Sequence, residues 1–333
     1  MDEIGLGGIL FVKNYLYISQ SGDGQYNLGL DEWFLDNVRD DELILYFYVN
    51  EKAVIIGKNQ NPRKECNIPQ MRNDGVQLVR RISGGGAVYH DGGNLNFSFI
   101  AGSSRFNKDD QHNFILNVVR SLGIECEFSG RNDLISNGRK FSGNAYCSKG
   151  KAKQHHGTLL VDTDLSRLQN YLTVDERKIR SKGVDSVVSR VCNLSQINSS
   201  ISVEELLLVI PKEFERTFGA YRQIATSELP VDKIKPYIKK HSSEEWLFGS
   251  TPAFDYIFDE RFTFGGVQIY MQLKSNVITS LTVHTDSMDT TLPDKIKDLL
   301  LFKELKKDTV CSALCSCNDD ALTAIADKFS EVL

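Results

Sequence analysis

The chain has 333 residues, of which 41% are hydrophobic and 25% charged, a composition typical of globular proteins and not of disordered or fibrous ones. Its net charge of −5 at pH 7 argues against nucleic acid as a partner, because phosphate binding needs a basic surface. No apolar run approaches the ~20 residues that span a bilayer, and the acidic N-terminus lacks the basic region of a signal peptide. We therefore expect a cytoplasmic protein that acts on neither membrane nor nucleic acid.

The cysteine count favours the same compartment. There are seven cysteines, an odd number, and they are scattered along the chain as expected of reduced thiols. Cys311, Cys315 and Cys317 form a C-x3-C-x-C cluster, a spacing compatible with zinc. No matching His or Cys pair lies nearby in the sequence, so we favour plain thiols over a metal site.

The first two thirds of the chain predict alternating helices and strands. Helical spacing of apolar residues predicts helices over Asn27–Asp40, with Asn27 as its cap, and over His112–Leu122. Alternating or β-rich apolar runs predict strands. These predicted strands are Leu43–Val49, Ala53–Ile56, Val76–Val79, Leu95–Phe99, Ile124–Phe128, Arg139–Ser142 and Gly157–Val161.

A capping box of Ser202 and Glu205 opens the next predicted helix, which Pro211 should kink or end. The polar segment Lys239–Thr251 is the predicted linker. We therefore expect a large mixed α/β domain over residues 1–245 and a small α+β domain over residues 253–333.

The small domain should contain a hairpin and two helices. Val267–Leu273 and Val277–Val283 alternate on either side of Ser275-Asn276, which is typical of a β-hairpin. Helical patterns follow near Pro293–Lys307 and over Asp320–Val332.

The densest chemical signal is the run Arg80–Asp91, RRISGGGAVYHD. Three consecutive glycines permit positive φ and let the backbone approach a ligand closely, and successive amides can form an anion-binding nest. The two arginines add fixed positive charge suited to phosphate or carboxylate. A Gly-rich turn with an accidental basic flank accounts for the run equally well. Neither the P-loop nor the Rossmann pattern is present, so ATP at this run would bind by another scheme.

Lys140 is the second signal. Alternation places Arg139 and Phe141 on one face of a strand and Lys140 on the other. A lysine that faces a cleft could stabilise a developing negative charge, and Asp133 could hold a cation or a ribose hydroxyl. The plainer alternatives are an exposed surface lysine and a turn residue.

A third patch begins with the lysines of Lys149–Lys153, whose spacing around a glycine predicts a solvated hairpin tip. His155 and His156 follow. Adjacent strand residues face opposite ways, so at most one of these histidines can enter a site, and we favour a pocket-lining role over metal ligation.

These motifs together resemble the lipoate–protein ligases, and the match is to the two-domain type A family. The resemblance runs from about Tyr17 to near the C-terminus, with several motifs in the right order. The stretches that carry it are Asn27-Leu28, Ile56–Pro62, Glu65–Asn67, Arg80–Asp91, Gly130–Leu134, Arg139–Gly143, His155–Leu160, Asp164–Ser166, Lys182–Val191, Asp259–Thr263 and Gly265-Gly266. Asp31 stands where the family more often has Glu, and residues 1–16 have no counterpart in it.

The resemblance implies a catalytic domain like that of biotin protein ligases and a small accessory domain. It implies ATP-dependent activation of lipoate to lipoyl-AMP, with Lys140 as the catalytic residue and Mg2+ accompanying the ATP, for which Asp133 is a candidate ligand. The segment Lys178–Arg190 is a candidate lid. The resemblance also implies that Arg81, Gly86, Ala87, Val88 and Tyr89 line the nucleotide and lipoate site. We add as candidate binding residues Ser83, Gly85, His90, Asn132, Asp133, Lys140, His156 and Thr158.

The implied partners are apo lipoyl domains of 2-oxoacid dehydrogenase E2 subunits or of the glycine-cleavage H protein. Three other interpretations remain open. An octanoyl or lipoyl transferase would work through a cysteine thioester without ATP, with Cys147 or Cys192 as the thiol. A lipoate-binding protein would keep the pocket without turnover, and a ligase of this fold could take biotin as its substrate.

Overall fold

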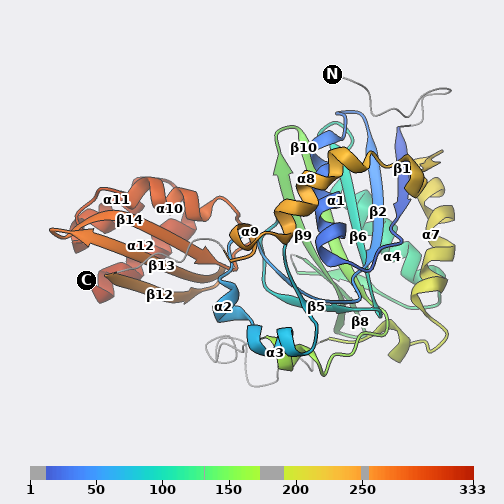
Figure 1. The fold of residues 1–333 in the computed structure, drawn as a ribbon, viewed down its shortest axis with the longest axis horizontal. Coiled ribbons are helices and arrows are strands. Elements are labelled where there is room, and N and C mark those ends of the chain that lie inside the picture. The colour runs from blue at the N-terminus through green and yellow to red at the C-terminus, as the bar shows by residue number, and fades with distance from the viewer. Residues whose placement is uncertain (1–12, 131, 173–190, 249–254) are drawn as a thin grey trace.

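A computed structural model describes residues 13–130, 132–172, 191–248 and 255–333 of the chain. Figure 1 shows two bodies joined at a narrow waist: a large α/β domain that carries the N-terminus and a small α+β domain that carries the C-terminus. No helix of these described ranges is long and apolar enough to cross a membrane. The mixed fold with a small accessory domain agrees with the sequence prediction.

The large domain is built on a mixed eight-stranded sheet in the order β11-β1-β2-β6-β10-β9-β8-β7. The strand β1 is parallel to both of its neighbours, and the other pairs are antiparallel. The strands are β1 Asn14–Ile18, β2 Leu43–Val49, β6 Asn94–Gly102, β7 Glu127–Ser129, β8 Asp133–Ser136, β9 Arg139–Lys149, β10 Ala152–Leu160 and β11 Arg222–Gln223.

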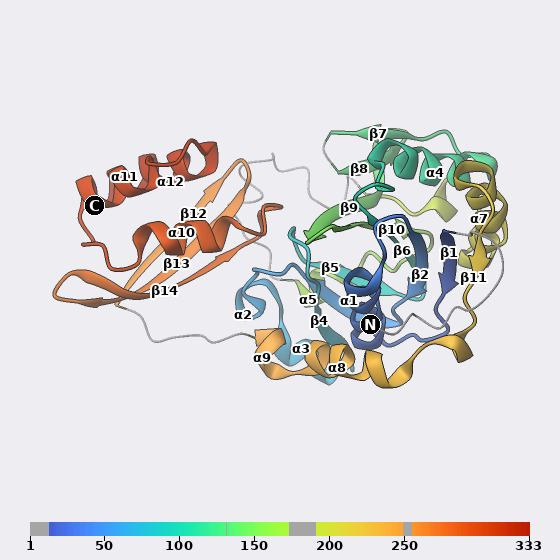
Figure 2. The same ribbon diagram turned by 90° about the horizontal axis from the view of Figure 1, so that it is seen from above.

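Helices cover both faces of this sheet, which explains why β2 is an unbroken apolar run. Leu45 and Phe47 enter a core shared with helices α4 (Lys108–Ser121) and α7 (Val203–Phe218). Ile44, Tyr46 and Tyr48 enter a second core, which is shared with α1 (Gly24–Asn37) and α8 (Val231–Ser242). Figure 2 shows the two layers on opposite sides of the strands.

A second, three-stranded sheet holds the Gly-rich run. Its order is β4-β3-β5, with β3 parallel to β4 and antiparallel to β5. The glycines connect β4 to β5 across β3, so the run is anchored by a strand at each end. The strands and the short helices of the large domain are β3 Lys52–Ile56, β4 Gln77–Arg80, β5 Val88–Asp91, α2 Pro62–Glu65, α3 Ile68–Asn73, α5 Leu168–Tyr171, η1 Leu194–Gln196, η2 Thr226–Glu228 and α9 Glu244–Phe248.

The small domain is a three-stranded antiparallel meander packed against helices around one apolar core. Ser275 and Asn276 join β13 to β14 with φ of 50° and 62°, the conformation of a two-residue hairpin turn, as predicted. Its elements are β12 Tyr256–Phe262, β13 Gly265–Lys274, β14 Val277–Thr285, α10 Leu292–Leu300, α11 Lys307–Leu314 and α12 Asp320–Val332.

One prediction on helix ends is wrong, and a second is wrong in part. Asp23 caps α1, through its side chain and the amides of Gln25 and Tyr26, whereas Asn27 lies buried in the second turn. The side chain of Asn27 is used inward, where it donates to the carbonyl of Val49 and to Asn50.

Pro211 does not end its helix, because α7 continues to Phe218. Ile210 and Phe214 on either side of it are buried in the core shared with α4, and this packing outweighs the backbone hydrogen bond that proline forfeits. Ser202 does cap α7, through the amide of Glu205.

Two further boundaries differ from prediction. The linker Lys239–Thr251 is helical in its described part, through the end of α8 and α9, and its last three residues lie outside the described ranges. The pattern near Pro293–Lys307 is helical only in its first half, α10, and its last residue begins α11, because the chain leaves α10 at Leu301 to pair its backbone with Ile278 of β14.

Candidate active site

Arg81 holds the Gly-rich run in shape. Its guanidinium donates to the backbone carbonyls of Ile55, Gly84 and Gly86 at 2.8–3.2 Å. Burial lowers the pKa of Arg81 to about 10, so the side chain remains a cation at neutral pH. A buried cation balanced by carbonyl oxygens leaves a positive potential at the loop, which favours an anionic ligand there.

Arg80 points the other way and acts as a structural clamp. Its guanidinium donates to the carbonyls of Gly57, Lys58 and Gln60 on one side and of Trp246 and Leu247 on the other. The clamp ties the loop after β3 to α9. Of the two arginines in the motif, only Arg81 therefore lies against the glycines.

The glycines meet different constraints. Gly85 has φ of 95°, and a Cβ there would lie 2.9 Å from Nη2 of Arg81. A Cβ on Gly57 would lie 2.1 Å from the carbonyl oxygen of Gly85, so the two segments pack backbone against backbone. Gly86 has nothing within 4 Å of its Cβ position among the described atoms, so that face of the run is open. The open position is where a ligand can approach the backbone.

Lys140 meets Asp133 across the β8–β9 hairpin. Nζ of Lys140 lies 2.7 Å from Oδ1 of Asp133, and the two side chains are 35% and 44% exposed. Phe141 beside Lys140 is fully buried, but so is Ser142, and the pairing of β8 with β9 shifts register between Leu134 and Ile135, so burial along Arg139–Ser142 does not alternate as predicted. A half-exposed ammonium on a rigid strand, held by one carboxylate, has donors left for a substrate.

Small neighbours give the ammonium of Lys140 its room. A Cβ on Gly143 would lie 3.1 Å from Nζ of Lys140. The amide of Gly143 donates to Oγ1 of Thr158 at 3.3 Å, and a Cβ on Gly157 would lie 2.7 Å from the carbonyl oxygen of Gly143. The structure thus brings Lys140, Asp133 and Thr158 together, with Gly143 as a neighbour that the sequence analysis did not select.

His156 connects the Gly-rich run to the main sheet. Its Nε2 lies 2.6 Å from Oγ of Ser83, and its Nδ1 lies 3.8 Å from Oδ2 of Asp31 on α1. A carboxylate, an imidazole and a hydroxyl in a row suggest a nucleophilic triad. Ser83 is completely buried, however, and 3.8 Å is too long for a hydrogen bond, so the row fixes the loop and does not expose a nucleophile.

His90 and Asp31 each have a buried polar atom that no described residue satisfies. Nδ1 of His90 accepts from Nδ2 of Asn50 at 3.1 Å, which places the proton on Nε2. Burial first, and then the charge of Arg81, lowers the pKa of His90 to about 3, so the ring is neutral. Nε2 of His90 and Oδ1 of Asp31 are buried and have no hydrogen-bond partner among the described atoms. Buried polar atoms are rarely left so in a finished fold, and a bound ligand is one group that can complete them.

Not every predicted binding residue lies on the same side of β5 as His90. His90 and Tyr89 are neighbours on β5 and point to opposite faces. Tyr89 is buried against Tyr171, with ring centroids 5.3 Å apart, in a core formed with β3 and α3. Val88 lies on the same face as His90, next to the core under α1, and Ala87 packs at the rim of the Tyr89 core. The candidate lid, Lys178–Arg190, lies outside the described residues.

Neither cysteine proposed for the transferase alternative is activated. Burial, with Asp31 and Glu32 nearby, raises the pKa of Cys147 to about 12, and its thiol lies 3.0 Å from Oε1 of Gln154. Burial also raises the pKa of Cys192, which is fully enclosed. A nucleophilic cysteine needs its pKa lowered by a neighbouring cation or base.

The small domain contacts the Gly-rich run directly. The amide of Gly85 donates to the carbonyl of Ser287 at 3.2 Å, and the amide of Thr285 donates to the carbonyl of Asn59 at 2.7 Å. A Cβ on Gly84 would lie 2.5 Å from the same Ser287 oxygen. The segment just after β14 therefore closes on the site, which the sequence analysis did not predict.

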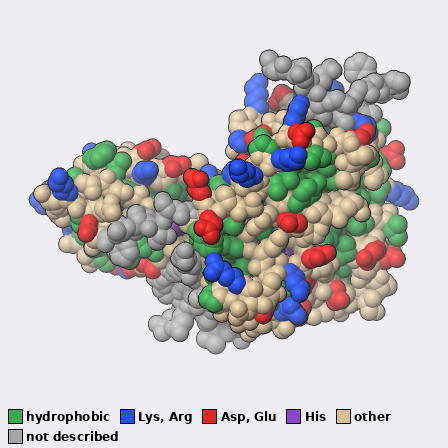
Figure 3. Space-filling model, in the orientation of Figure 1, with side chains coloured by type: hydrophobic (Ala, Val, Ile, Leu, Met, Phe, Trp, Pro, Cys, Tyr) green, Lys and Arg blue, Asp and Glu red, His purple; other side chains and the backbone are tan. Residues whose placement is uncertain are grey.

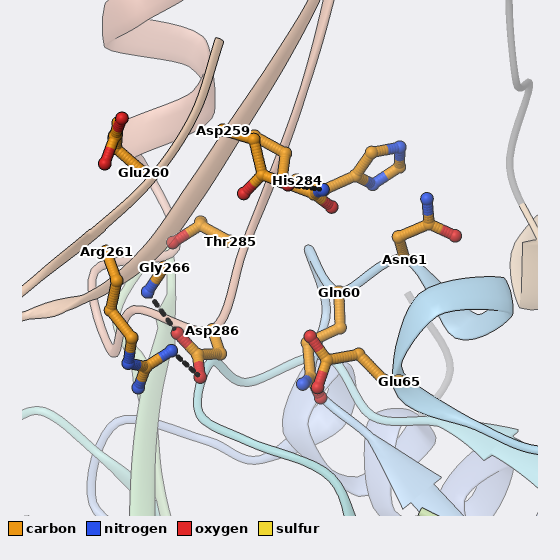
Figure 4. A pocket seen from close by; sticks show the side chains of 11 residues that line it. Gln60, Asn61, Glu65, Asp259, Glu260, Arg261, Gly266, His284, Thr285 and Asp286 are labelled. Atoms are coloured by element: carbon orange, nitrogen blue, oxygen red, sulfur yellow. Dashed lines mark hydrogen bonds and ion pairs between the residues drawn. The ribbon is translucent and has the colours of Figure 1, made fainter. Parts of the chain in front are cut away.

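A polar pocket lies beside this contact, between the domains. In Figure 4 Gln60, Asn61 and Glu65 of the large domain face His284 and Thr285 of the small one. Asp286 orders its floor by accepting from the amide of Gly266 at 2.7 Å and from Arg261 at 3.3 Å. The family motif around Arg261 thus builds the edge of the small domain that meets the large one.

No extended basic patch is visible among the described residues on the face drawn in Figure 3, where acidic and basic side chains are interspersed. Among the described residues no group of three or more His, Cys, Asp or Glu side chains is placed to hold a metal ion. Cys315 and Cys317 of the C-x3-C-x-C cluster are exposed thiols, and Cys311 lies 3.3 Å from the carbonyl of Ala326.

Comparison with known proteins gives this site its family. The family described as lipoyl protein ligase A/B catalytic domain matches residues 23–215, and the one described as bacterial lipoate protein ligase C-terminus matches residues 251–333. The chain is similar to lipoate-protein ligase A of Bdellovibrio bacteriovorus, with 35% identity over 312 residues, which cover 91% of this chain and 92% of that protein. This chain belongs to the lipoate–protein ligase A family.

Solved structures of lipoate–protein ligases agree. P. falciparum LipL1, in complex with lipoate, matches with 28% identity and a TM-score of 0.82 over 96% of this chain and 99% of that chain. The bi-partite ligase of Thermoplasma acidophilum, described with its E2 lipoyl domain, matches with 29% identity and a TM-score of 0.62 over 73% of this chain and 99% of that chain. A lipoate-protein ligase A bound with ATP matches with 28% identity and a TM-score of 0.60 over 71% of this chain and 99% of that chain.

Proposed function

We propose that this chain is an ATP-dependent lipoate–protein ligase, which activates lipoate to lipoyl-AMP and then transfers the lipoyl group to a lysine of an acceptor protein. Its place in the family supports the reaction class. One similar structure holds lipoate and another holds ATP. The observation that carries the proposal is the Lys140–Asp133 pair, an oriented and partly free ammonium on a rigid hairpin.

In the first half-reaction the lipoate carboxylate attacks the α-phosphorus of ATP. A new bond forms from the carboxylate oxygen to phosphorus, the bond to the bridging oxygen breaks, and pyrophosphate leaves. Negative charge accumulates on the phosphoryl oxygens in the transition state. Lys140 supplies a fixed positive charge for these oxygens, and Asp133 keeps its side chain in one orientation before the substrate arrives.

The residues present fit a Mg2+ ion of the kind that accompanies ATP. Mg2+ is usually held by one or two carboxylates together with substrate phosphates and water. Asp133 is a half-exposed carboxylate beside the proposed phosphate position, and it would hold the ion. When bound, the ion would add positive charge at the phosphates.

In the second half-reaction the neutral amine of the acceptor lysine attacks the carbonyl carbon of lipoyl-AMP. An amide bond forms, the mixed anhydride breaks, AMP leaves, and the amine gives up a proton. The donors of Lys140 are suited to polarise that carbonyl as well. This route needs no thiol, in keeping with the raised pKa values of Cys147 and Cys192.

The Gly-rich run is the proposed binding surface for both substrates. Gly86 leaves its backbone open to a ligand, and Arg81 beneath it keeps the potential positive. Nε2 of His90 and Oδ1 of Asp31, both without a partner among the described atoms, mark where polar groups of a bound ligand would complete the buried hydrogen bonds. The proposed acceptors are apo lipoyl domains of E2 subunits or of the glycine-cleavage H protein, and the archaeal relative is described with an E2 lipoyl domain.

The decisive experiment incubates the protein with lipoate, Mg-ATP and an apo lipoyl domain. AMP, pyrophosphate and the acceptor mass are read together. We expect stoichiometric AMP, pyrophosphate and lipoylated acceptor, and no acceptor modification without ATP. ATP-independent transfer from an acyl carrier that is lost in a cysteine variant would establish the transferase alternative. Tight lipoate binding without AMP would establish a binding protein, and preference for biotin would change the substrate.

A further inference from the structure

A row of buried polar side chains crosses the large domain behind the candidate site. It begins at Gln111 on α4, passes through His155 on β10 and Asn144 on β9, and ends at the backbone of Asn132. Asn132 directly precedes Asp133, the partner of Lys140. None of the roles proposed above for catalysis or ligand binding uses Gln111, His155 or Asn144.

His155 is the fixed centre of this row. Its side chain is completely buried, with its ring stacked between those of Tyr146 and Phe99 at centroid distances of 4.7 and 5.7 Å. Phe97 and His112 close two further sides, edge to face, at 5.5 and 4.9 Å. An imidazole enclosed in this way has one orientation, so its two nitrogens point in fixed directions.

The hydrogen bonds define which nitrogen carries the proton. Burial holds the pKa of His155 well below its usual value, so the ring is neutral with a single N–H. Nδ2 of Asn144 donates to the carbonyl of Asn132 at 3.0 Å, which leaves Oδ1 of Asn144 to face Nε2 of His155 at 2.8 Å. Nε2 is therefore the donor, and Nδ1 is the acceptor.

Gln111 completes this assignment. Oε1 of its amide lies 3.1 Å from Nδ1 of His155, and its Nε2 has no partner among the described atoms. A half-turn of the amide exchanges the two atoms, which gives Nδ1 a donor and relieves the unpartnered nitrogen. With the ring neutral, every contact from Gln111 to Asn132 is then a matched donor and acceptor.

Asn144 connects His155 to the candidate site. Its backbone amide and its side-chain Nδ2 both donate to the same carbonyl, that of Asn132, at 2.9 and 3.0 Å. Two donors on one carbonyl fix the peptide that leads into Asp133. His155 holds the other end of the Asn144 amide, with Nε2 2.8 Å from Oδ1.

We propose that His155 is a positioning residue for carboxylate activation, which acts through Asn144 and Asn132 to hold Asp133 against Lys140. His155 itself touches neither substrate nor the reacting atoms. The inference rests on the proposed role of Lys140 and deepens it, because it identifies what holds the carboxylate partner of that lysine in place. Loss of the link displaces Asp133 and Lys140 by a fraction of the reaction distance, and a shift of about 1 Å can cost about 10²-fold in rate.

Two amide variants of His155 isolate the link, because each can replace only one of the two ring nitrogens. In His155→Gln the side-chain nitrogen reaches the position of Nε2 and can still donate to Asn144, whereas in His155→Asn the polar atoms reach only the position of Nδ1. Both lose the ring, and Asn is smaller than Gln by one methylene, so the melting temperature of each variant is measured beside its kcat. We expect kcat for pyrophosphate release to be about 10- to 100-fold lower in His155→Asn than in His155→Gln, with KM values for ATP and lipoate within about threefold of each other. Equal kcat values in the two variants would overturn the proposal.

His112 is the matched control. It belongs to the same aromatic cluster, but its Nε2 contacts the hydroxyl of Tyr146 at 2.5 Å and not Asn144. His112→Gln and His112→Asn should give the same kcat as each other. If both His155 variants unfold, Asn144→Ala removes the side-chain donor outside the cluster and should lower kcat by a similar factor, while an unchanged kcat there would also overturn the proposal.

A Lys140→Ala background separates this inference from the proposed function. In single-turnover adenylation the Gln–Asn difference at position 155 should disappear there, because the link ends at the missing ammonium. A difference that persists in full means that His155 acts by another route, and the positioning role fails. If Lys140→Ala alone leaves pyrophosphate release unchanged, the proposed function of Lys140 fails instead.

Discussion

The two domains have interiors of different chemistry. The large domain buries many polar side chains, including Asp31, Ser83, His90, Asn144 and His155, and several of them form hydrogen bonds to other buried side chains. The core of the small domain is apolar throughout its described residues. Its buried polar residues there, Gln268, Thr285 and Ser287, lie at the edge that meets the large domain.

This difference indicates that the two domains have different roles. Buried polar networks cost stability unless every member is satisfied, and they are worthwhile where a site must be held rigidly. The large domain therefore carries the proposed chemistry. The small domain folds by simple apolar burial and presents one polar edge to the Gly-rich run, through Thr285 and Ser287.

The strongest test of this division is Lys140→Ala. Removal of one group that stabilises transition-state charge typically costs about 2.7–4 kcal/mol, or roughly 10²–10³ in rate. We expect pyrophosphate release to fall by that factor with the circular dichroism spectrum unchanged. Lys151→Ala, at the exposed turn between β9 and β10, is the matched control and should retain activity. Wild-type adenylation by a folded Lys140→Ala protein would remove Lys140 from the mechanism.

Ile269→Ala tests the other side of the comparison. Ile269 is completely buried in the small-domain core, so its truncation should cost about 2–5 kcal/mol there. All the proposed adenylation residues lie in the large domain, so pyrophosphate release should survive when the small domain is weakened, while lipoyl transfer falls. Thermal unfolding followed alongside both half-reactions measures this. Parallel loss of both half-reactions would show that the domains are not separable in this way.

The neutral histidines of the large domain predict acid sensitivity. The pKa of His90 is about 3 when folded and near 6.5 when unfolded. Between about pH 6.5 and pH 3, His90 is protonated in the unfolded chain and neutral in the folded one. Its contribution to the free energy of unfolding is therefore fully present above about pH 6.5 and is lost as the pH falls. The expected slope is up to about 1.4 kcal/mol per pH unit for this group. Urea unfolding from pH 7 to 4 should show a shallower decline in His90→Gln, which cannot titrate, and an unchanged decline would contradict this role for His90.

Gly86→Val tests whether the open face of the run is a ligand surface. The added side chain meets no described atom near its Cβ, so the fold should tolerate it. It would occupy the space proposed for substrate, and we expect Kd for lipoate and ATP to rise about tenfold, equivalent to 1.4 kcal/mol. Gly57→Ala is the contrasting variant, because its Cβ would clash with Gly85, and it should lower the melting temperature. An equal loss of melting temperature in both variants would favour a purely structural turn.

The smallest effect is expected for the cysteines. Cys147→Ala and Cys192→Ala, singly and together, should retain lipoyl transfer within about threefold, since buried thiols with raised pKa values act as small apolar groups. Omission of ATP should abolish transfer in every variant. The acceptor mass after incubation with free lipoate is the measurement, and loss of transfer in either variant would support a thioester route.

Local sequence patterns determined much of the secondary structure and which residues stood out as candidates for the site. The period of apolar residues predicted β2, β6, α12 and the β13–β14 hairpin, because these elements need only a buried face and a suitable turn. The Gly-rich run and Lys140 stood out for the same local reason, since residue type and spacing set what they can bind. Asn27 shows the limit: its position favoured a cap, but Asp23 four residues earlier could also serve, and distant Asn50 decided between them.

Only the tertiary structure decided how the site is assembled. Ser83 meets His156 across 73 residues, and Gly85 meets Ser287 across about 200, and no local pattern encodes such pairs. The same holds for the roles of the two arginines. Arg80 and Arg81 are the same type of residue, and their roles differ because different carbonyls surround them. Composition and spacing determine which groups can do chemistry, whereas their orientation depends on long-range packing, which places each donor opposite its acceptor.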